Sequence, residues 1–119
     1  MPNIQDFSVP ANNTALVTCD VTTVIPGDTL DGSTVEWFAY QQLHGVTTST
    51  VVLAKTSSSA GGGINILSSP PMTFTIEIDA ADTINLLGNF YHEATVIDEG
   101  GSRVTVLYGL MTVLQTENP

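Results

Sequence analysis

Residues 72–78 read MTFTIEI, and this short stretch decides the fold class. Phe74, Ile76 and Ile78 fall on one side of an extended chain, because successive side chains of a β-strand point to opposite faces. Two threonines and a glutamate fall on the other side. Apolar and polar residues that alternate with a period of two are typical of a strand with one buried face.

The same alternation continues outward from this strand in both directions. Residues 15–21 place Val17 and Cys19 on one face. In residues 34–41 one face carries Val35, Trp37 and Ala39, and the opposite face carries Glu36, Phe38 and Tyr40. Thr and Val, which favour pleated sheets, are frequent in these runs. Further strands are predicted at 49–55, 63–67, 89–97 and 103–115.

Turn-forming residues separate the predicted strands. The segment 99–102 reads EGGS and predicts a hairpin turn, and His44-Gly45 predicts another turn. Gly109 interrupts the last strand pattern, which indicates a bulge. The glycine-rich segment 57–63 is predicted to be a flexible loop. Further turn signals stand at 26–28, 31–33 and 70–71.

One segment, at about residues 79–87, breaks the strand pattern and predicts a short helical turn. Asp79 is the expected N-cap, and Asp82 falls in the first turn, where the helix dipole favours an acid. Gly88 stands where a glycine would end the helix. Two apolar side chains of the segment are expected to close the bottom of the fold, Ile84 and Leu87.

These elements predict an all-β fold, an immunoglobulin-like β-sandwich of about seven to eight antiparallel strands with one short helical turn. The length of 119 residues predicts a single domain, residues 1–119, that is large enough to bury its own core. Residues 1–13 are expected to form an extended N-terminal arm and residues 115–119 a polar C-terminal tail. Trp37 falls on what would be a central strand.

The charge balance excludes several classes of partner. Twelve acidic residues stand against Lys55 and Arg103, which gives a net charge of -10, while 42% of residues are hydrophobic. A chain with this charge is repelled by nucleic acid and by an anionic membrane surface. The first residues carry no basic or apolar signal-peptide pattern, and no apolar run is long enough for a membrane span. Synthesis in a cytosol is therefore expected, with Cys19 as a small buried hydrophobe.

A series of short motifs runs through roughly residues 30–114. In the C-terminal part they are Asp79–Thr83, Gly88–Ala94, Asp98 with the following glycines, Thr105–Gly109 and Thr112-Val113. Earlier in the chain they are Leu30–Trp37, Lys55-Thr56 and Gly62–Ile64. Together these motifs resemble those of a group of small immunoglobulin-like virion proteins of tailed phages, related to the N-terminal domain of baseplate upper proteins.

This resemblance implies a structural accessory protein of a phage particle, made in the host cytoplasm and located in the virion. A capsid decoration or cement protein on the outer shell is the preferred form, and a neck, tail or baseplate component is the alternative. Its implied partners are other virion structural proteins, with self-association left open. Neither nucleic acid nor a membrane is expected as a partner.

No catalytic, cofactor or metal residue is predicted, and the chain is not expected to be an enzyme. His92 and Glu93 are neighbours on a strand and point to opposite faces, so they cannot act as an acid–base pair. His92 is instead expected at the edge of the core with a backbone partner. Three aspartates could contribute oxygen ligands to a calcium site, Asp6, Asp28 and Asp31. The segment 27–32 lacks the alternating ligands of an EF-hand loop, however, and ordinary turns explain the same residues.

Outward aromatic residues are the most informative surface feature. Phe38 and Tyr40 are predicted on the wet face of their strand, and aromatic side chains are enriched at protein interfaces. Together with Tyr91 they form the predicted protein interface. A bulge, or coverage by the chain's own termini, would explain the same residues without a partner. Tyr40, Tyr91 and Glu93 also allow a second class of function, a carbohydrate-binding or cell-surface-binding module.

Overall fold

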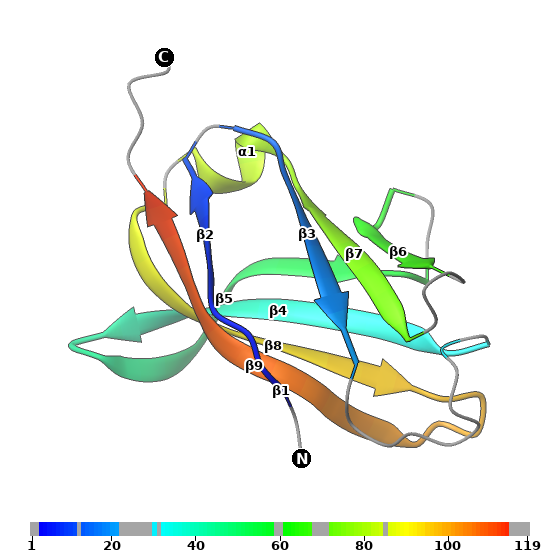
Figure 1. Cartoon of the computed structure of the whole chain (residues 1–119). Helices are drawn as coiled ribbons and strands as arrows, with labels where there is room; N and C mark the ends of the chain where they lie inside the picture. The colour runs from blue at the N-terminus through cyan, green and yellow to red at the C-terminus, as the bar shows by residue number, and fades with distance from the viewer. Residues whose placement is uncertain are drawn as a thin grey trace.

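The computed structural model describes residues 3–11, 13–21, 30, 32–58, 61–67, 72–84 and 86–114. Within them, two β-sheets pack face to face as a sandwich (Figure 1). The six-stranded sheet contains β1 (Asn3–Ile4), β2 (Phe7–Pro10), β4 (Thr34–Leu43), β5 (Val46–Thr56), β8 (Gly88–Ile97) and β9 (Arg103–Leu114). The three-stranded sheet contains β3 (Ala15–Asp20), β6 (Ile64–Leu67) and β7 (Thr73–Ile78), and the helix α1 spans Ala80–Thr83.

The strand order is that of an immunoglobulin-like sandwich. One sheet runs β9-β8-β4-β5 and the other runs β3-β7-β6, so the chain crosses between sheets as the Greek-key arrangement requires. The predicted all-β sandwich is therefore confirmed. The prediction that every strand is antiparallel is wrong at one edge, because β1 and β2 pair with β9 in parallel.

Within the predicted N-terminal arm, residues 3–4 and 7–10 are thus strands of the six-stranded sheet. Two short strands flank Gln5 and Asp6, where the alternation of the sequence breaks. The Gln5 amide still donates to the carbonyl of Tyr108, and the Asp6 carboxylate accepts a hydrogen bond from the Leu110 amide. The Gln5 side chain donates to the Thr18 carbonyl on β3, and so links the two sheets. Residues 115–119 lie outside the described part of the chain.

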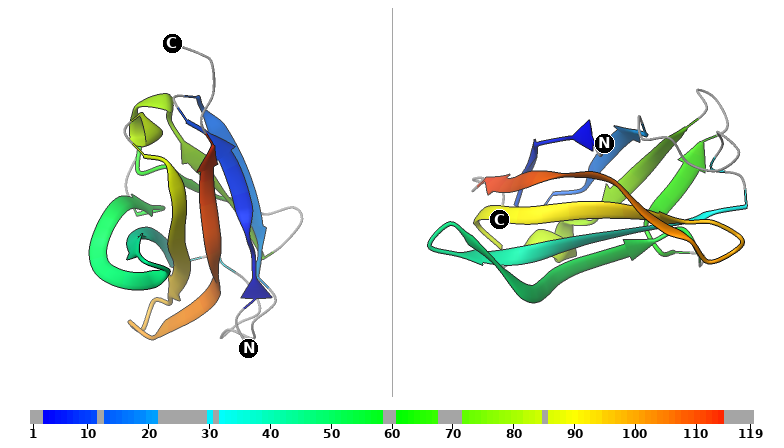
Figure 2. Two further views of the ribbon diagram at one scale, coloured as in Figure 1. Left: turned by 90° about the vertical axis from the view of Figure 1, so that its left-hand side faces the viewer. Right: turned by 90° about the horizontal axis from the view of Figure 1, so that it is seen from below.

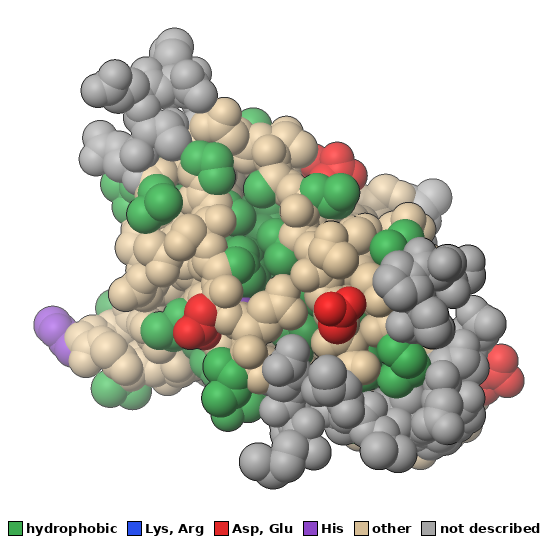
Figure 3. Space-filling view, viewed as in Figure 1, with side chains coloured by type: hydrophobic (Ala, Val, Ile, Leu, Met, Phe, Trp, Pro, Cys, Tyr) green, Lys and Arg blue, Asp and Glu red, His purple; other side chains and the backbone are tan. Residues whose placement is uncertain are grey.

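The core contains the inward faces that the alternation predicted. Trp37 on β4 is fully buried, as are Phe74, Ile76 and Ile78 on β7. On the opposite face of β7 only Glu77 is exposed, because β7 is the central strand of its sheet and neighbouring side chains cover the threonines. Figure 3 shows hydrophobic side chains at the base of a hollow between the two sheets, on the side where β2 and β3 lie.

The helical segment is shorter than predicted. Asp79 and Asp82 form the expected N-terminal cap, and the Asp79 amide donates to the Asp82 carboxylate at 2.8 Å. The helix ends at Thr83, however, and Gly88 begins β8 instead of ending the helix. The prediction that Ile84 and Leu87 close the sandwich is wrong, since their side chains are 59% and 60% exposed. A single helical turn aims Thr83 inward, and the following chain packs Leu86 against the core.

Two of the predicted turns are confirmed. His44 and Gly45 both adopt positive φ at the tip of the β4–β5 hairpin, which projects beyond the sandwich (Figures 1 and 2). The Asp98 amide donates to the Ser102 carbonyl and closes the β8–β9 hairpin.

Gly109 does not form the predicted bulge, and the shift in register falls between Ala94 and Thr95. A Cβ on Gly109 would overlap the Gln5 carbonyl, so the glycine permits the close approach of the N-terminal strand.

An ion pair joins the six-stranded sheet to the helix that follows β7. The Lys55 ammonium on β5 lies 2.6 Å from the Asp82 carboxylate, and the side chains are 11% and 24% exposed. The same Asp82 oxygen accepts from the Asp79 amide, so one carboxylate serves as helix cap and ion-pair partner. Lys55 therefore bridges the two layers near the edge of the core.

Candidate protein-binding face

The outer surface of the six-stranded sheet carries a group of aromatic side chains around one carboxylate. We call Phe38, Tyr40, Tyr91, Glu93 and Tyr108 the aromatic face. The strand register brings them together: Tyr40 lies opposite Tyr91, and Glu93 lies between Phe38 on β4 and Tyr108 on β9. All five side chains are partly exposed. The aromatic face therefore spans three neighbouring strands, on the side that points away from the core.

The four rings form a continuous stripe. The ring centroids are 6.4 Å apart for Phe38 and Tyr40, 6.0 Å for Tyr40 and Tyr91, and 6.4 Å for Tyr91 and Tyr108. Tilted rings at such distances attract one another through their quadrupoles. Contacts between neighbouring rings restrict their rotamers, and side chains restricted before binding lose less entropy when a partner binds.

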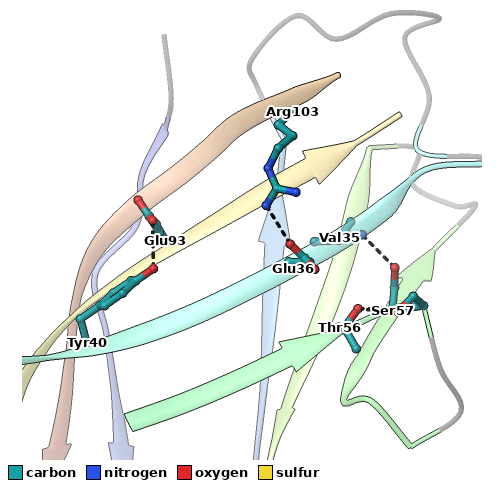
Figure 4. A network of polar contacts seen from close by, with 8 residues as sticks. Val35, Glu36, Tyr40, Thr56, Ser57, Glu93 and Arg103 are labelled. Carbon is teal, nitrogen blue, oxygen red and sulfur yellow. Dashed lines mark hydrogen bonds and ion pairs between the residues drawn. The ribbon is translucent and has the colours of Figure 1, made fainter. Parts of the chain in front are cut away.

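Glu93 is held at the centre by two phenols. The Tyr40 hydroxyl donates to Oε1 at 3.4 Å, and the Tyr91 hydroxyl donates to Oε2 at 3.2 Å. Figure 4 shows Tyr40 and Glu93 pointing toward one another from β4 and β8. Burial, followed by the negative charge of Glu93, raises the pKa of Tyr91 to about 12 and also raises the pKa of Tyr40. Both hydroxyls therefore stay protonated as donors at neutral pH.

Exposed aliphatic side chains extend the aromatic face on both sides. Val51 of β5 lies opposite Tyr40, and Leu110 of β9 lies opposite Tyr91. Their side chains are 46% and 38% exposed. Ile4 of β1, which is 63% exposed, pairs with Tyr108. The result is an apolar surface across the sheet with one acidic centre, which is unusual for an isolated monomer.

The structure brings the three predicted interface residues, Phe38, Tyr40 and Tyr91, onto one surface. The register of β4 shifts between Ala39 and Tyr40, yet Phe38 and Tyr40 remain on the same outer face. The described N-terminal strands lie along the edge at β9 and leave the aromatic face uncovered. In the described part of the chain, therefore, neither a bulge that turns these side chains inward nor coverage by the chain's own ends is supported. That these residues bind a partner stays a prediction.

The sequence did not predict Tyr108 in the interface, and Glu93 was considered there as a sugar-binding residue and as a partner of His92, but not as part of a protein interface. Tyr108 stands one residue before Gly109, and the strand 103–115 does not alternate clearly. Its outward direction follows only from its pairing with Glu93 across the β8–β9 ladder. For Glu93 the sequence did carry a signal: it stands two positions after Tyr91 on the same strand, so the two side chains share a face.

His92 is fully buried, and the expected backbone partner is present. Its Nε2 lies 2.6 Å from the carbonyl oxygen of Gln5, and its Nδ1 accepts from the Trp37 indole at 3.1 Å. These two bonds define the tautomer, with the proton on Nε2. His92 therefore joins the central strand β4 to the N-terminal strands and is a structural residue.

The remaining candidates of the sequence have structural roles or lie outside the description. Asp6 caps the Leu110 amide, and Asp28 and Asp31 lie outside the described residues. Among the described residues, no group of three or more His, Cys, Asp or Glu side chains is arranged to hold a metal ion. Cys19 is buried, and burial raises the pKa of its thiol to about 12.

A cleft of about 620 Å³ opens beside the three-stranded sheet, where Gly61–Gly63 faces Glu77. Polar groups around this cleft already form hydrogen bonds within the chain. The Thr56 and Glu77 amides donate to glycine carbonyls of this segment, and the Ser57 hydroxyl accepts from the Val35 amide (Figure 4). With Glu77 in the lining, an anionic ligand is disfavoured, and the cleft is a weaker candidate than the aromatic face.

Comparison with known proteins matches no family model and no curated protein. Within the residues that the structure describes, none of the helices has the length and apolar character needed to cross a membrane.

Proposed function

We propose that this protein is a non-enzymatic structural component of a tailed-phage particle that docks onto another virion protein through the aromatic face. The observation that carries the proposal is the stripe of four rings on the outer face of the six-stranded sheet. The preferred form is a capsid decoration protein on the outer shell. A neck, tail or baseplate component remains the alternative form of the same function.

The charge distribution supports an outward location. The net charge of -10 opposes contact with packaged DNA. It also keeps a sandwich with open sheet edges soluble before assembly, since like charges discourage edge-to-edge association. Affinity for the particle would then come from the aromatic and aliphatic side chains at the centre of the face, as in other protein interfaces.

Substitution on the face tests this proposal. Phe38→Asp places a charge among the rings, and Leu16→Asp is the matched control, since Leu16 is 67% exposed on the other sheet. Both variants are expected to fold, but only Phe38→Asp should be lost from purified particles, as measured by quantitative mass spectrometry. Full incorporation of Phe38→Asp would overturn the proposal. A copy number close to that of the major capsid protein indicates decoration, and a count close to that of the tail or neck rings indicates the alternative.

A carbohydrate-binding module is the second candidate. Its support is the pair of rings, Tyr40 and Tyr91, with the Glu93 carboxylate between them on an open surface. A glycan array with the purified protein tests it, with Tyr91→Ala as the comparison. Glycan binding that is lost in this variant would favour the module over the particle protein.

A further inference from the structure

Among the residues that the structure describes, no cationic side chain pairs with the Glu93 carboxylate. The chain has two basic side chains, Lys55 and Arg103. Lys55 pairs with Asp82 at 2.6 Å, and Arg103 pairs with Glu36 at 3.0 Å. The Arg103 guanidinium lies at Glu36, which precedes Phe38 by two positions on β4, so this ion pair stands at one end of the aromatic face. Both internal cations are therefore engaged elsewhere, and neutral phenols are the donors that the structure gives to Glu93.

We propose that the aromatic face is a receptor for a guanidinium or ammonium group carried by a protein partner, with Glu93 as its counter-charge. Tyr40 and Tyr91 supply the ring faces that flank the cation. The inference rests on the proposed docking function and names the chemistry of the docked segment. Arginine is the preferred ligand, because its planar group both pairs with a carboxylate and stacks on aromatic rings.

The geometry leaves room for such a ligand. A carboxylate has about four acceptor positions, and the two phenols occupy one on each oxygen. The free positions are available to two parallel N–H donors of a guanidinium. A cation within about 6 Å of a ring centre gains further attraction from the ring quadrupole. The centroids of Tyr40 and Tyr91 are 6.0 Å apart, so one cation can lie close to both rings.

Electrostatics favour a basic partner over a second copy of this chain. Two copies that met through the aromatic face would bring two Glu93 carboxylates together, and each copy carries a net charge of -10. Like charges facing each other across an interface disfavour association, whereas opposite charges speed it and set its register.

Titration with two short peptides tests the proposal. The probes are acetyl-Gly-Arg-Gly-amide and the same peptide with citrulline, which has nearly the shape of arginine but no charge. NMR signals of the Tyr40 and Tyr91 rings follow the binding of each probe to the full chain. We expect saturable shifts with the arginine peptide, and binding at least about tenfold weaker for citrulline, which corresponds to about 1.4 kcal/mol.

Two variants with the same change in net charge separate a specific site from general attraction. Glu93→Gln should weaken the binding of the arginine peptide about tenfold, which is a loss of about 1.4 kcal/mol of binding free energy. Glu77→Gln removes an exposed carboxylate on β7 of the other sheet, and it should change the affinity by less than about twofold. In the unsubstituted protein, the bound arginine peptide should also lower the pKa of Tyr91, followed by phenolate absorbance.

Equal binding of both peptides, or equal effects of the two variants, would overturn the inference. So would concentration-dependent dimerisation through the aromatic face without any peptide binding. The docking proposal is tested separately by Phe38→Asp in particles. If that variant is excluded while the arginine peptide does not bind, the docking function stands and its partner presents a neutral surface.

Discussion

Acidification is expected to destabilise this fold through His92. The imidazole is fully buried, and its Nδ1 accepts a hydrogen bond from the Trp37 indole N–H while its Nε2–H donates to the Gln5 carbonyl. A second proton would have to bind Nδ1, where it would face another N–H donor and break the bond to Trp37. Burial accordingly lowers the pKa of His92 below its usual 6.5, although the Gln5 carbonyl and the Asp6 charge oppose the shift.

The direction and size of the effect follow from this lowered pKa. Below about pH 6.5 the unfolded chain takes up a proton at His92 that the folded chain refuses, so the free energy of unfolding falls as the pH falls. Above that pH both states are neutral, and the full stability is present. The slope is at most about 1.4 kcal/mol per pH unit, and it ends where the folded histidine itself titrates.

Urea unfolding followed by the fluorescence of Trp37, the single tryptophan, measures the effect at several pH values between 7.5 and 5. His92→Gln supplies an amide that can accept from Trp37 and donate to Gln5 but does not titrate. It should cost about 1–3 kcal/mol at pH 7.5 through imperfect geometry, and its stability should depend less on pH. His44→Asn, at the exposed hairpin turn, should keep the slope of the parent protein. Identical slopes for the parent and His92→Gln would refute this reasoning.

Further predictions concern the ion pair between Lys55 and Asp82, the sheet edge at β9 and the buried thiol of Cys19. Lys55→Met leaves the Asp82 carboxylate without its cation near the core and should lower the free energy of unfolding in urea by about 2 kcal/mol. Arg103→Met removes a more exposed ion pair and should lower it by less than about 1 kcal/mol. Equal losses in the two variants would contradict this reasoning. Gly109→Ala should destabilise by about 1–3 kcal/mol, with faster hydrogen exchange in β1 and β2, whereas Gly100→Ala in the β8–β9 turn should stay within about 0.5 kcal/mol. Cys19 should react with a thiol reagent at pH 8 only after urea is added, and rapid reaction of the native protein would show that the strand opens.

Much of the fold could be predicted because the sandwich depends on local alternation. Trp37 and Phe74 share their faces with other apolar residues two positions away, and this pattern is readable in a single strand. The N-terminal strands were missed because Gln5 and Asp6 break the alternation after only two paired residues. Their place in the sheet comes from contacts with β9, which no local pattern records.

The candidate site was predictable only in part, for a similar reason. Phe38, Tyr40 and Tyr91 face outward by the parity of their own strands. The position of Glu93 between two phenols, and of Tyr108 beside it, depends on how three strands align. The short helix shows the limit of local signals. The cap at Asp79 marks where the helix begins, but the glycine at 88 does not mark where it ends, which is at Thr83.

The parallel pairing of β1 and β2 with β9 has a consequence for the order of folding. The hydrogen bond between Asp6 and Leu110 spans 104 positions, so the N-terminal strands have no place to pair until Arg103–Leu114 has been synthesised. Contacts between residues so far apart in the sequence form slowly, because the chain must close a large loop before it gains them. Before that moment β8 presents an unpaired edge, which is a template for wrong strand pairing. Strand β9 therefore completes the sheet along both of its own edges, with β8 on one side and β1 and β2 on the other.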